Sequence, residues 1–233
     1  MGELVLVRHG QASFFGASYD ELSPLGLRQS AALGDHWARH HLEVATVYVG
    51  PRRRHHQTYE RVSAAFRARG LPFPAAQELA ELDEHHGLAV MKHALGGSGA
   101  STAAINPLEE SEAAREQIVR RFFIRYVEVM GEWASGALVV PDVETWAEFR
   151  ARSLRALDIM CTGAGTAVAF TSGGLVSSAT GWLLGLDATR VIDLSANLRN
   201  TALTEVRWSA RRRSLVSFNG LPHLPDPKAV TAV

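Results

Sequence analysis

Histidine and arginine side chains follow short apolar segments of the chain and could together act on an anionic group. Arg8 and His9 come directly after the Leu- and Val-rich run from Glu3 to Val7, and Arg54 follows shortly after Gly50-Pro51. A neutral imidazole keeps a nitrogen lone pair near pH 7, so His9 could attack a phosphoryl group. The planar guanidinium groups of Arg8 and Arg54 could bind its oxygens and stabilise the charge of the transition state. Two nearby cations would also lower the pKa of His9 and keep its ring neutral.

Each of these residues also has a simpler structural interpretation. A histidine at the end of a strand is often a hydrogen-bonded loop residue, and the run from Arg52 to Arg54 could be the solvated start of a helix. The functional interpretation is favoured because further motifs follow these residues in order along the chain.

The apolar pattern predicts the strands and helices that would hold these side chains. In chain order, the expected elements are a strand at 3–7, a helix from Pro24 capped by Ser23, a strand at 45–49, a helix at 51–69, a strand at 167–171, a helix at 174–184, and closing strands at 202–208 and 214–218. This alternation predicts an α/β fold of three layers, a doubly wound and mostly parallel sheet with helices on both faces. The loops at the strand ends would then converge, which brings Arg8-His9-Gly10, Gly50-Pro51 and Ser172-Gly173-Gly174 together.

The middle of the chain has a different pattern, and we expect a single domain over 1–233 with a helical insertion at about 88–160 that covers the site. A long helix is expected to begin near Asn106-Pro107. Its apolar stripe comprises Val119, Phe122, Phe123, Tyr126, Met130 and Trp133. Another helix is expected from Asp142, as N-cap, to about Met160.

The motifs resemble those of the histidine phosphatase superfamily, the phosphoglycerate mutase-like fold. The resemblance rests on Leu6-Val7-Arg8-His9-Gly10, on Leu22 to Gln29 as "L-[ST]-x-x-G-x-x-Q", on Pro51 to Thr58 as "P-x-x-R-x-x-Q-T", and on Asn200-Thr201-Ala202 near the C-terminus. It implies a phosphohistidine intermediate on His9, phosphate binding by Arg8 and Arg54, and no metal or other cofactor. The implied substrate is a small phosphorylated molecule.

The family also supplies a carboxylic acid that protonates the leaving oxygen. Glu81, Asp83 and Glu84 are the candidates, and Glu84 is chosen because Leu82-Asp83-Glu84 with the following glycine is more similar to the family's "L-x-E". His85 and His86 are either surface residues or members of the pocket, with the surface interpretation favoured. Gln11 is a further possible pocket residue.

One position departs from the family pattern. Most members have "S-H-G-G" after the fourth strand, whereas this chain has Thr171-Ser172-Gly173-Gly174, so Ser172 stands at the position of a second phosphate-binding histidine. Ser172 and the amide of Gly173 could still bind phosphate at a helix N-terminus, and His85 or His86 could replace the missing imidazole. The segment that mutases use for a second acidic group is also missing, so a phosphatase is favoured over a mutase. A non-catalytic binder of a phosphorylated ligand is the alternative.

Composition restricts the other classes. The 233 residues carry 24 Lys+Arg and 24 Asp+Glu, a formal net charge of zero, which argues against nucleic-acid binding through Arg52 to Arg54 and Arg211 to Arg213. One cysteine, Cys161, fits a reducing cytoplasm. The uncharged stretch from Ile159 to Leu186 is long enough to span a membrane, but its glycine and serine residues favour a strand, a turn and a helix.

Overall fold

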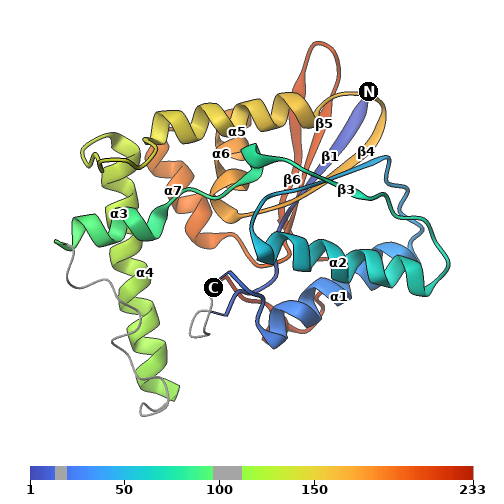
Figure 1. Ribbon diagram of the computed structural model, residues 1–233, viewed down its shortest axis with the longest axis horizontal. Helices are drawn as coiled ribbons and strands as arrows, with labels where there is room; N and C mark the ends of the chain where they lie inside the picture. Colours follow the sequence, from blue (N-terminus) through green and yellow to red (C-terminus); the bar gives the residue numbers. More distant parts are fainter. Residues whose placement is uncertain (14–19, 97–111, 233) are drawn as a thin grey trace.

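The first strand of the chain lies inside a six-stranded sheet. The computed structural model describes residues 1–13, 20–96 and 112–232, and side chains of residues 112–116 and 119 are not described. The strands are β1 (Gly2–Arg8), β2 (Thr46–Val49), β3 (Ala76–Glu78), β4 (Gly165–Thr171), β5 (Leu203–Trp208) and β6 (Arg213–Gly220), in the order β3-β2-β4-β1-β5-β6 (Figure 1). The four strands from β3 to β1 are parallel, and β5 and β6 add an antiparallel edge.

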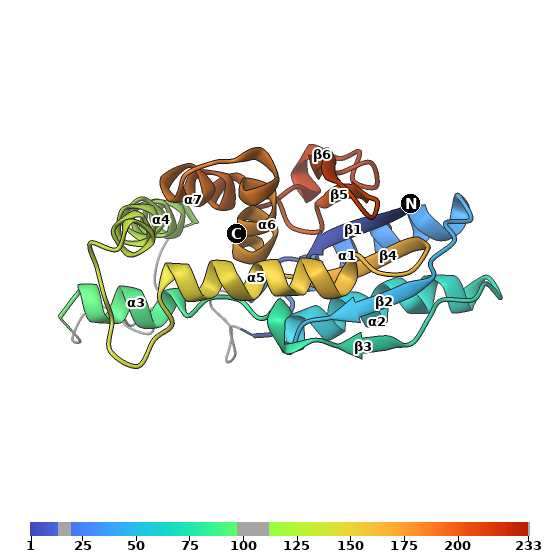
Figure 2. The same ribbon diagram turned by 90° about the horizontal axis from the view of Figure 1, so that it is seen from above.

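Helices cover both faces of this sheet, which confirms the three-layer α/β fold. The helices are α1 (Pro24–Arg39), α2 (Arg53–Ala68), α3 (Gly87–Ala94), α4 (Glu112–Ser135), α5 (Trp146–Met160), α6 (Gly173–Leu184) and α7 (Ala188–Asn197), with short 3-10 turns at η1 (Ala80–Leu82) and η3 (Pro227–Ala229). Alternate residues of β1 point to opposite faces, so Val5 and Val7 pack in the core under α1 and α2 while Leu4 and Leu6 pack under α5 and α6 (Figure 2). A strand buried on both faces explains the unbroken apolar run.

Of two predicted helix N-caps, one is confirmed and the other is wrong. Ser23 caps α1 as predicted, because its hydroxyl accepts a hydrogen bond from the Gly26 amide. The predicted N-cap Asp142 is wrong: α5 begins at Trp146, and Thr145 caps it in a reciprocal pair with Glu148. This capping box satisfies amides at both ends of the first turn, which a lone aspartate three residues earlier cannot do.

Helices α3 and α4 extend beyond the end of the sheet, whereas α5 lies beside α6 over one face (Figure 1). Of the predicted stripe on α4, Met130 and Trp133 are buried and Phe122, Phe123 and Tyr126 are half-buried. The predicted helix start near Asn106 lies outside the described residues. Within the described part of the chain, no helix is long and apolar enough to cross a membrane.

Candidate active site

His9 is fixed at the end of β1 by hydrogen bonds on its backbone and its ring. Its amide donates to the Thr171 carbonyl of β4 at 2.9 Å, and its carbonyl accepts from the Asn200 side chain at 3.3 Å. The ring Nδ1 lies 2.7 Å from the Gly10 carbonyl oxygen. Because a carbonyl can only accept, the proton of a neutral ring resides on Nδ1, and Nε2 keeps its lone pair.

The surroundings of His9 keep this ring neutral. Burial lowers its pKa well below the ordinary value of 6.5, and the positive charges of Arg54 and Arg8 lower it further. The sequence-based expectation for this pKa named the two arginines, and burial is the larger cause.

Arg54 lies at the centre of the site and contacts residues from three different segments. Its Nε donates to His9 Nε2 at 3.1 Å, its Nη1 pairs with Asp20 at 2.8 Å, and its Nη2 donates to the Ser172 hydroxyl at 3.3 Å. The side chain is only 6% exposed. Arg8, at the end of β1, donates through Nη1 to the Leu198 carbonyl and also lines the pocket. Two guanidinium groups and an imidazole therefore converge, as predicted from the strand ends.

Glu84 is the acidic residue among the described residues that line this pocket. It follows η1, and the loop is held against the sheet because the Thr171 hydroxyl donates to the Leu82 carbonyl at 2.7 Å. Its Oε2 accepts from the Gly174 amide at 3.1 Å and its Oε1 from the His85 amide at 3.0 Å. A Cβ at position 174 would lie 2.2 Å from Glu84 Oε1, so the second glycine of the pair leaves room for the carboxylate.

Burial alone would raise the pKa of Glu84, but the neighbouring groups outweigh it. His85, the Gly174 amide and Arg54 together hold that pKa below the ordinary value of 4.5. Glu84 is therefore a carboxylate near neutral pH.

The two rival acids have other surroundings. Asp83 forms an ion pair with Arg52 at 2.5 Å, and its carboxylate also accepts the Glu84 amide. Glu81 belongs to η1, and it is not among the described residues that line the pocket.

The remaining candidate residues are His85 and His86, which line the pocket, and Gln11, which is not among its described lining residues. His85 is buried against Trp133 and Phe149, and it lines the pocket together with the exposed His86. The favoured surface interpretation therefore does not describe His85. The Gln11 side chain accepts a hydrogen bond from Ser23 at 2.8 Å, so it links the loop after β1 to the start of α1. Gln11 is not one of the described lining residues.

Position 172 has a partner that the sequence analysis missed. Gly173 lines the pocket, but Ser172 is not among the described lining residues. The buried Ser172 hydroxyl lies 2.6 Å from His55 Nε2. His55 follows Arg54 directly in α2, and its ring centroid is 5.7 Å from that of His9. The only signal in the sequence was its place beside Arg54.

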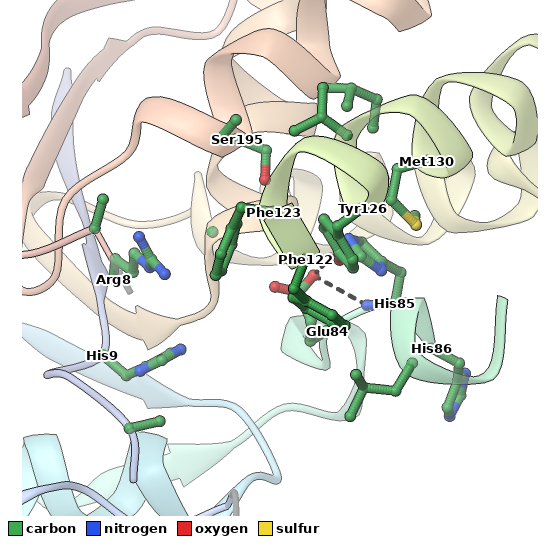
Figure 3. A pocket seen from close by; sticks show the side chains of 18 of the residues that line it. Arg8, His9, Glu84, His85, His86, Phe122, Phe123, Tyr126, Met130 and Ser195 are labelled. Atoms are coloured by element: carbon green, nitrogen blue, oxygen red, sulfur yellow. Dashed lines mark hydrogen bonds and ion pairs between the residues drawn. The ribbon is translucent and has the colours of Figure 1, made fainter. Parts of the chain in front are cut away.

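The pocket has a volume of about 230 Å³ and two walls of different chemistry. The charged wall consists of residues from strand ends, loops and the start of α2: Arg8, His9, Arg52, Arg54 and Glu84. The opposite wall comes from the helices: Leu88 of α3, Phe122, Phe123, Tyr126, Val127 and Met130 of α4, and Ile192, Ser195 and Ala196 of α7. Figure 3 shows the Phe123 ring projecting from α4 toward the side of the pocket that holds Arg8 and His9. No group of three or more His, Cys, Asp or Glu side chains in the described residues could hold a metal ion.

Comparisons with known proteins concern the family and the fold of the chain. A family model described as the histidine phosphatase superfamily (branch 1) matches residues 4–93 and 111–220. No curated protein matches the sequence.

Several solved structures share the fold at low identity. YhfR from Bacillus stearothermophilus is 15% identical with a TM-score of 0.66, over 96% of this chain and 99% of the other. Phosphoserine phosphatase from Entamoeba histolytica with 3-phosphoglyceric acid is 17% identical with a TM-score of 0.63, over 96% and 100%. A mycobacterial glucosyl-3-phosphoglycerate phosphatase with inorganic phosphate is 21% identical with a TM-score of 0.61, over 95% and 99%.

Proposed function

The chain belongs to the histidine phosphatase superfamily, branch 1, and from that premise we propose that it hydrolyses phosphomonoesters through a phosphohistidine on His9. The observation that carries the proposal is the state of the His9 ring. Its Nδ1 proton faces the Gly10 carbonyl, and its Nε2 lone pair lies beside Arg54. An imidazole held in this state can act as a nucleophile without a general base.

In the first proposed step, His9 Nε2 forms a bond to phosphorus and the ester P–O bond breaks. The non-bridging oxygens take over the guanidinium donors of Arg54 and Arg8, which stabilise the charge of the transition state. The Arg54 hydrogen bond to Nε2 is released at this point, so the lone pair becomes available. The departing alcohol oxygen receives a proton from Glu84.

In the second step, water attacks phosphorus and the P–Nε2 bond breaks. Glu84, now a carboxylate, takes the proton of that water and passes it to the departing phosphate, so inorganic phosphate leaves and Glu84 and His9 both return to their starting forms. The same carboxyl group therefore serves as acid and then as base.

Because the pKa of Glu84 lies below its ordinary value, the proton that it gives to the alcohol must come from another group. We assign it to the substrate, because a phosphomonoester has a second pKa of about 6 and enters partly as the monoanion. Binding the phosphoryl group also places negative charge near Glu84, which favours its protonated form.

The helical wall favours substrates whose alcohol part is apolar. Every described residue that α4 contributes to the lining is apolar or aromatic, and the described arginines of the pocket lie on the phosphate side. A second anionic group directed toward α4 would lose water without gaining a cation there. We therefore propose monophosphates of aryl or alkyl alcohols as the substrate class.

The proposal is tested by following p-nitrophenyl phosphate hydrolysis in the presence of EDTA. Wild-type enzyme should turn over and, when quenched during turnover with labelled substrate, carry acid-labile phosphate on His9. His9→Ala should show neither turnover nor label. Label on another residue, or full turnover by His9→Ala, would refute the covalent step. Phosphate binding without turnover of any phosphomonoester would support the non-catalytic binder instead, for which the Ser172 departure is the motivating observation.

A further inference from the structure

Most members of the family have a histidine at position 172. This chain has Ser172 there, and its hydroxyl contacts the imidazole of His55. The Ser172 hydroxyl has hydrogen-bond contacts to Arg54 Nη2 at 3.3 Å and to His55 Nε2 at 2.6 Å. All three residues are buried. His55 belongs to α2 and Ser172 to the turn after β4, so this contact joins a helix and a turn that both contribute to the site.

The backbone around His55 leaves room for its imidazole. A Cβ at Gly50 would lie 2.4 Å from His55 Nδ1 and 2.8 Å from the Leu82 carbonyl oxygen. Any other residue at position 50 would displace either the ring or the loop that leads to Glu84. The ring therefore occupies a space that this loop is shaped to provide.

The Arg54 guanidinium, the Ser172 hydroxyl and the His55 imidazole differ in which of them can donate a hydrogen bond. A guanidinium only donates, so the Ser172 oxygen accepts from Arg54. The hydroxyl has one proton, and His55 Nε2 accepts it when the proton of the neutral His55 ring resides on Nδ1. In that tautomer the hydroxyl proton points toward His55, and Ser172 is not among the described residues that line the pocket.

We propose that His55 and Ser172 form a positioning pair that holds the Arg54 guanidinium beside His9, in place of a second phosphate-binding histidine. This inference rests on the proposed phosphatase function, and it makes His55 and Ser172 positioning residues that act through Arg54. Burial, and then the charge of Arg54, lowers the pKa of His55 well below its ordinary value, so the ring is neutral and able to accept.

Single replacements test whether the pair acts through Arg54. Ser172→Ala and His55→Leu should each lower kcat by about 10- to 10²-fold, since a small displacement of a phosphate-binding group has effects of this size. His55→Gln should recover much of the loss, because the glutamine oxygen can accept from Ser172 near the position of Nε2. His56→Leu is the matched control. His56 is the next residue, its side chain is 36% exposed and it pairs with Glu78, so the kcat of His56→Leu should equal that of the wild type.

Combined replacements give a readout that general destabilisation would not produce. Ser172→Ala/His55→Leu should be no slower than the slower single variant, and neither change should slow an Arg54→Lys enzyme further. Ser172→His alone should lose activity, because its imidazole would collide with His55. Adding His55→Ala to Ser172→His should restore part of it. Losses that multiply with Arg54→Lys, or unchanged kcat in Ser172→Ala and His55→Leu, would overturn the inference.

Measuring the affinity for inorganic phosphate distinguishes a failure of this inference from a failure of the proposed function. If the wild type hydrolyses no phosphomonoester, the proposed function fails, and phosphate affinity by calorimetry then tests the pair alone. Ser172→Ala and His55→Leu should weaken phosphate binding by about tenfold, the effect of one lost contact to a charged group, while His56→Leu should not. Equal affinities in all four proteins would refute the positioning role.

Discussion

Replacing Arg54 with lysine keeps a positive charge next to His9 but removes the shape of the guanidinium. The three nitrogens of Arg54 contact His9, Asp20 and Ser172, which lie in different directions around the group. One lysine ammonium on a flexible stem can occupy one of these positions at a time. We therefore expect Arg54→Lys to be nearly as damaging as Arg54→Ala.

The expected decrease in kcat of Arg54→Lys follows from the hydrogen bonds of Arg54 that lysine cannot form. A hydrogen bond to a charged group contributes about 1.5–3 kcal/mol, and lysine would lose about two of them. Only the part that strengthens in the transition state lowers kcat, so we expect about 3 kcal/mol, or roughly 10²-fold. Arg53→Lys is the matched control because the Arg53 side chain is 62% exposed and pairs with Glu21 at the surface. Such pairs contribute about 0.2–1 kcal/mol to stability and should leave kcat unchanged.

The measurement is kcat and KM for p-nitrophenyl phosphate in wild type, Arg54→Lys, Arg54→Ala and Arg53→Lys, with thermal unfolding of each protein in parallel. Unfolding temperatures close to that of the wild type would assign the rate loss to the site. The reasoning fails if Arg54→Lys keeps more than about a third of the wild-type kcat, or if Arg53→Lys loses as much activity as Arg54→Lys.

Three further predictions concern the acid, the apolar wall and pH stability. Glu84→Gln should slow alkyl phosphates far more than p-nitrophenyl phosphate, because a basic leaving oxygen needs a proton. Glu81→Gln should show no such dependence on the leaving group. If it does, Glu81 and not Glu84 is the general acid. Phe123→Ala should raise KM for naphthyl phosphate by about tenfold, because apolar contact with the substrate is lost. Ile124→Ala, a change at an exposed neighbour, should leave KM unchanged. Equal effects of the two changes would refute the proposed contact between the apolar wall and the alcohol. Burial, aided by His36, lowers the pKa of His223 to about 4 from 6.5, so the unfolded chain binds the extra proton between these values and stability falls as pH drops through this window. The loss from this group should reach about 3 kcal/mol in urea titrations, and His223→Gln should flatten the curve between pH 6.5 and 4.

Local sequence signals predicted the parts of the fold that depend on near neighbours. Strand β1 is an unbroken apolar run because it is buried on both faces, and Ser23 caps α1 through an amide three residues away. Strand β3 escaped prediction because its three residues are mostly exposed and show no apolar pattern. The α5 start was misplaced because Thr145 with Glu148 competes with an aspartate of similar capping propensity.

The positions of site residues could be predicted where a residue comes shortly after a strand. Arg8, His9 and Arg54 follow strand ends, and the topology of a parallel sheet brings such ends together. The role proposed for His55 has no local signature, because its partner Ser172 is 117 positions away in the chain. Glu84 and Glu81 look similar in sequence, and only the short turn of η1 determines which of them reaches Gly174.

The origin of the two pocket walls has a consequence for how this enzyme can be diversified. The charged wall comes from strand ends, loops and the start of α2, whose geometry is tied to the sheet, whereas the apolar wall comes largely from α4, whose packing partners are α3, α5 and α7. Exchanging side chains on α4 therefore alters the shape offered to the alcohol without moving the atoms arranged around the phosphoryl group. A library randomised at positions 122, 123, 126 and 127 should yield folded variants with new alcohol preferences. Randomising the strand-end loops should instead yield mostly inactive proteins.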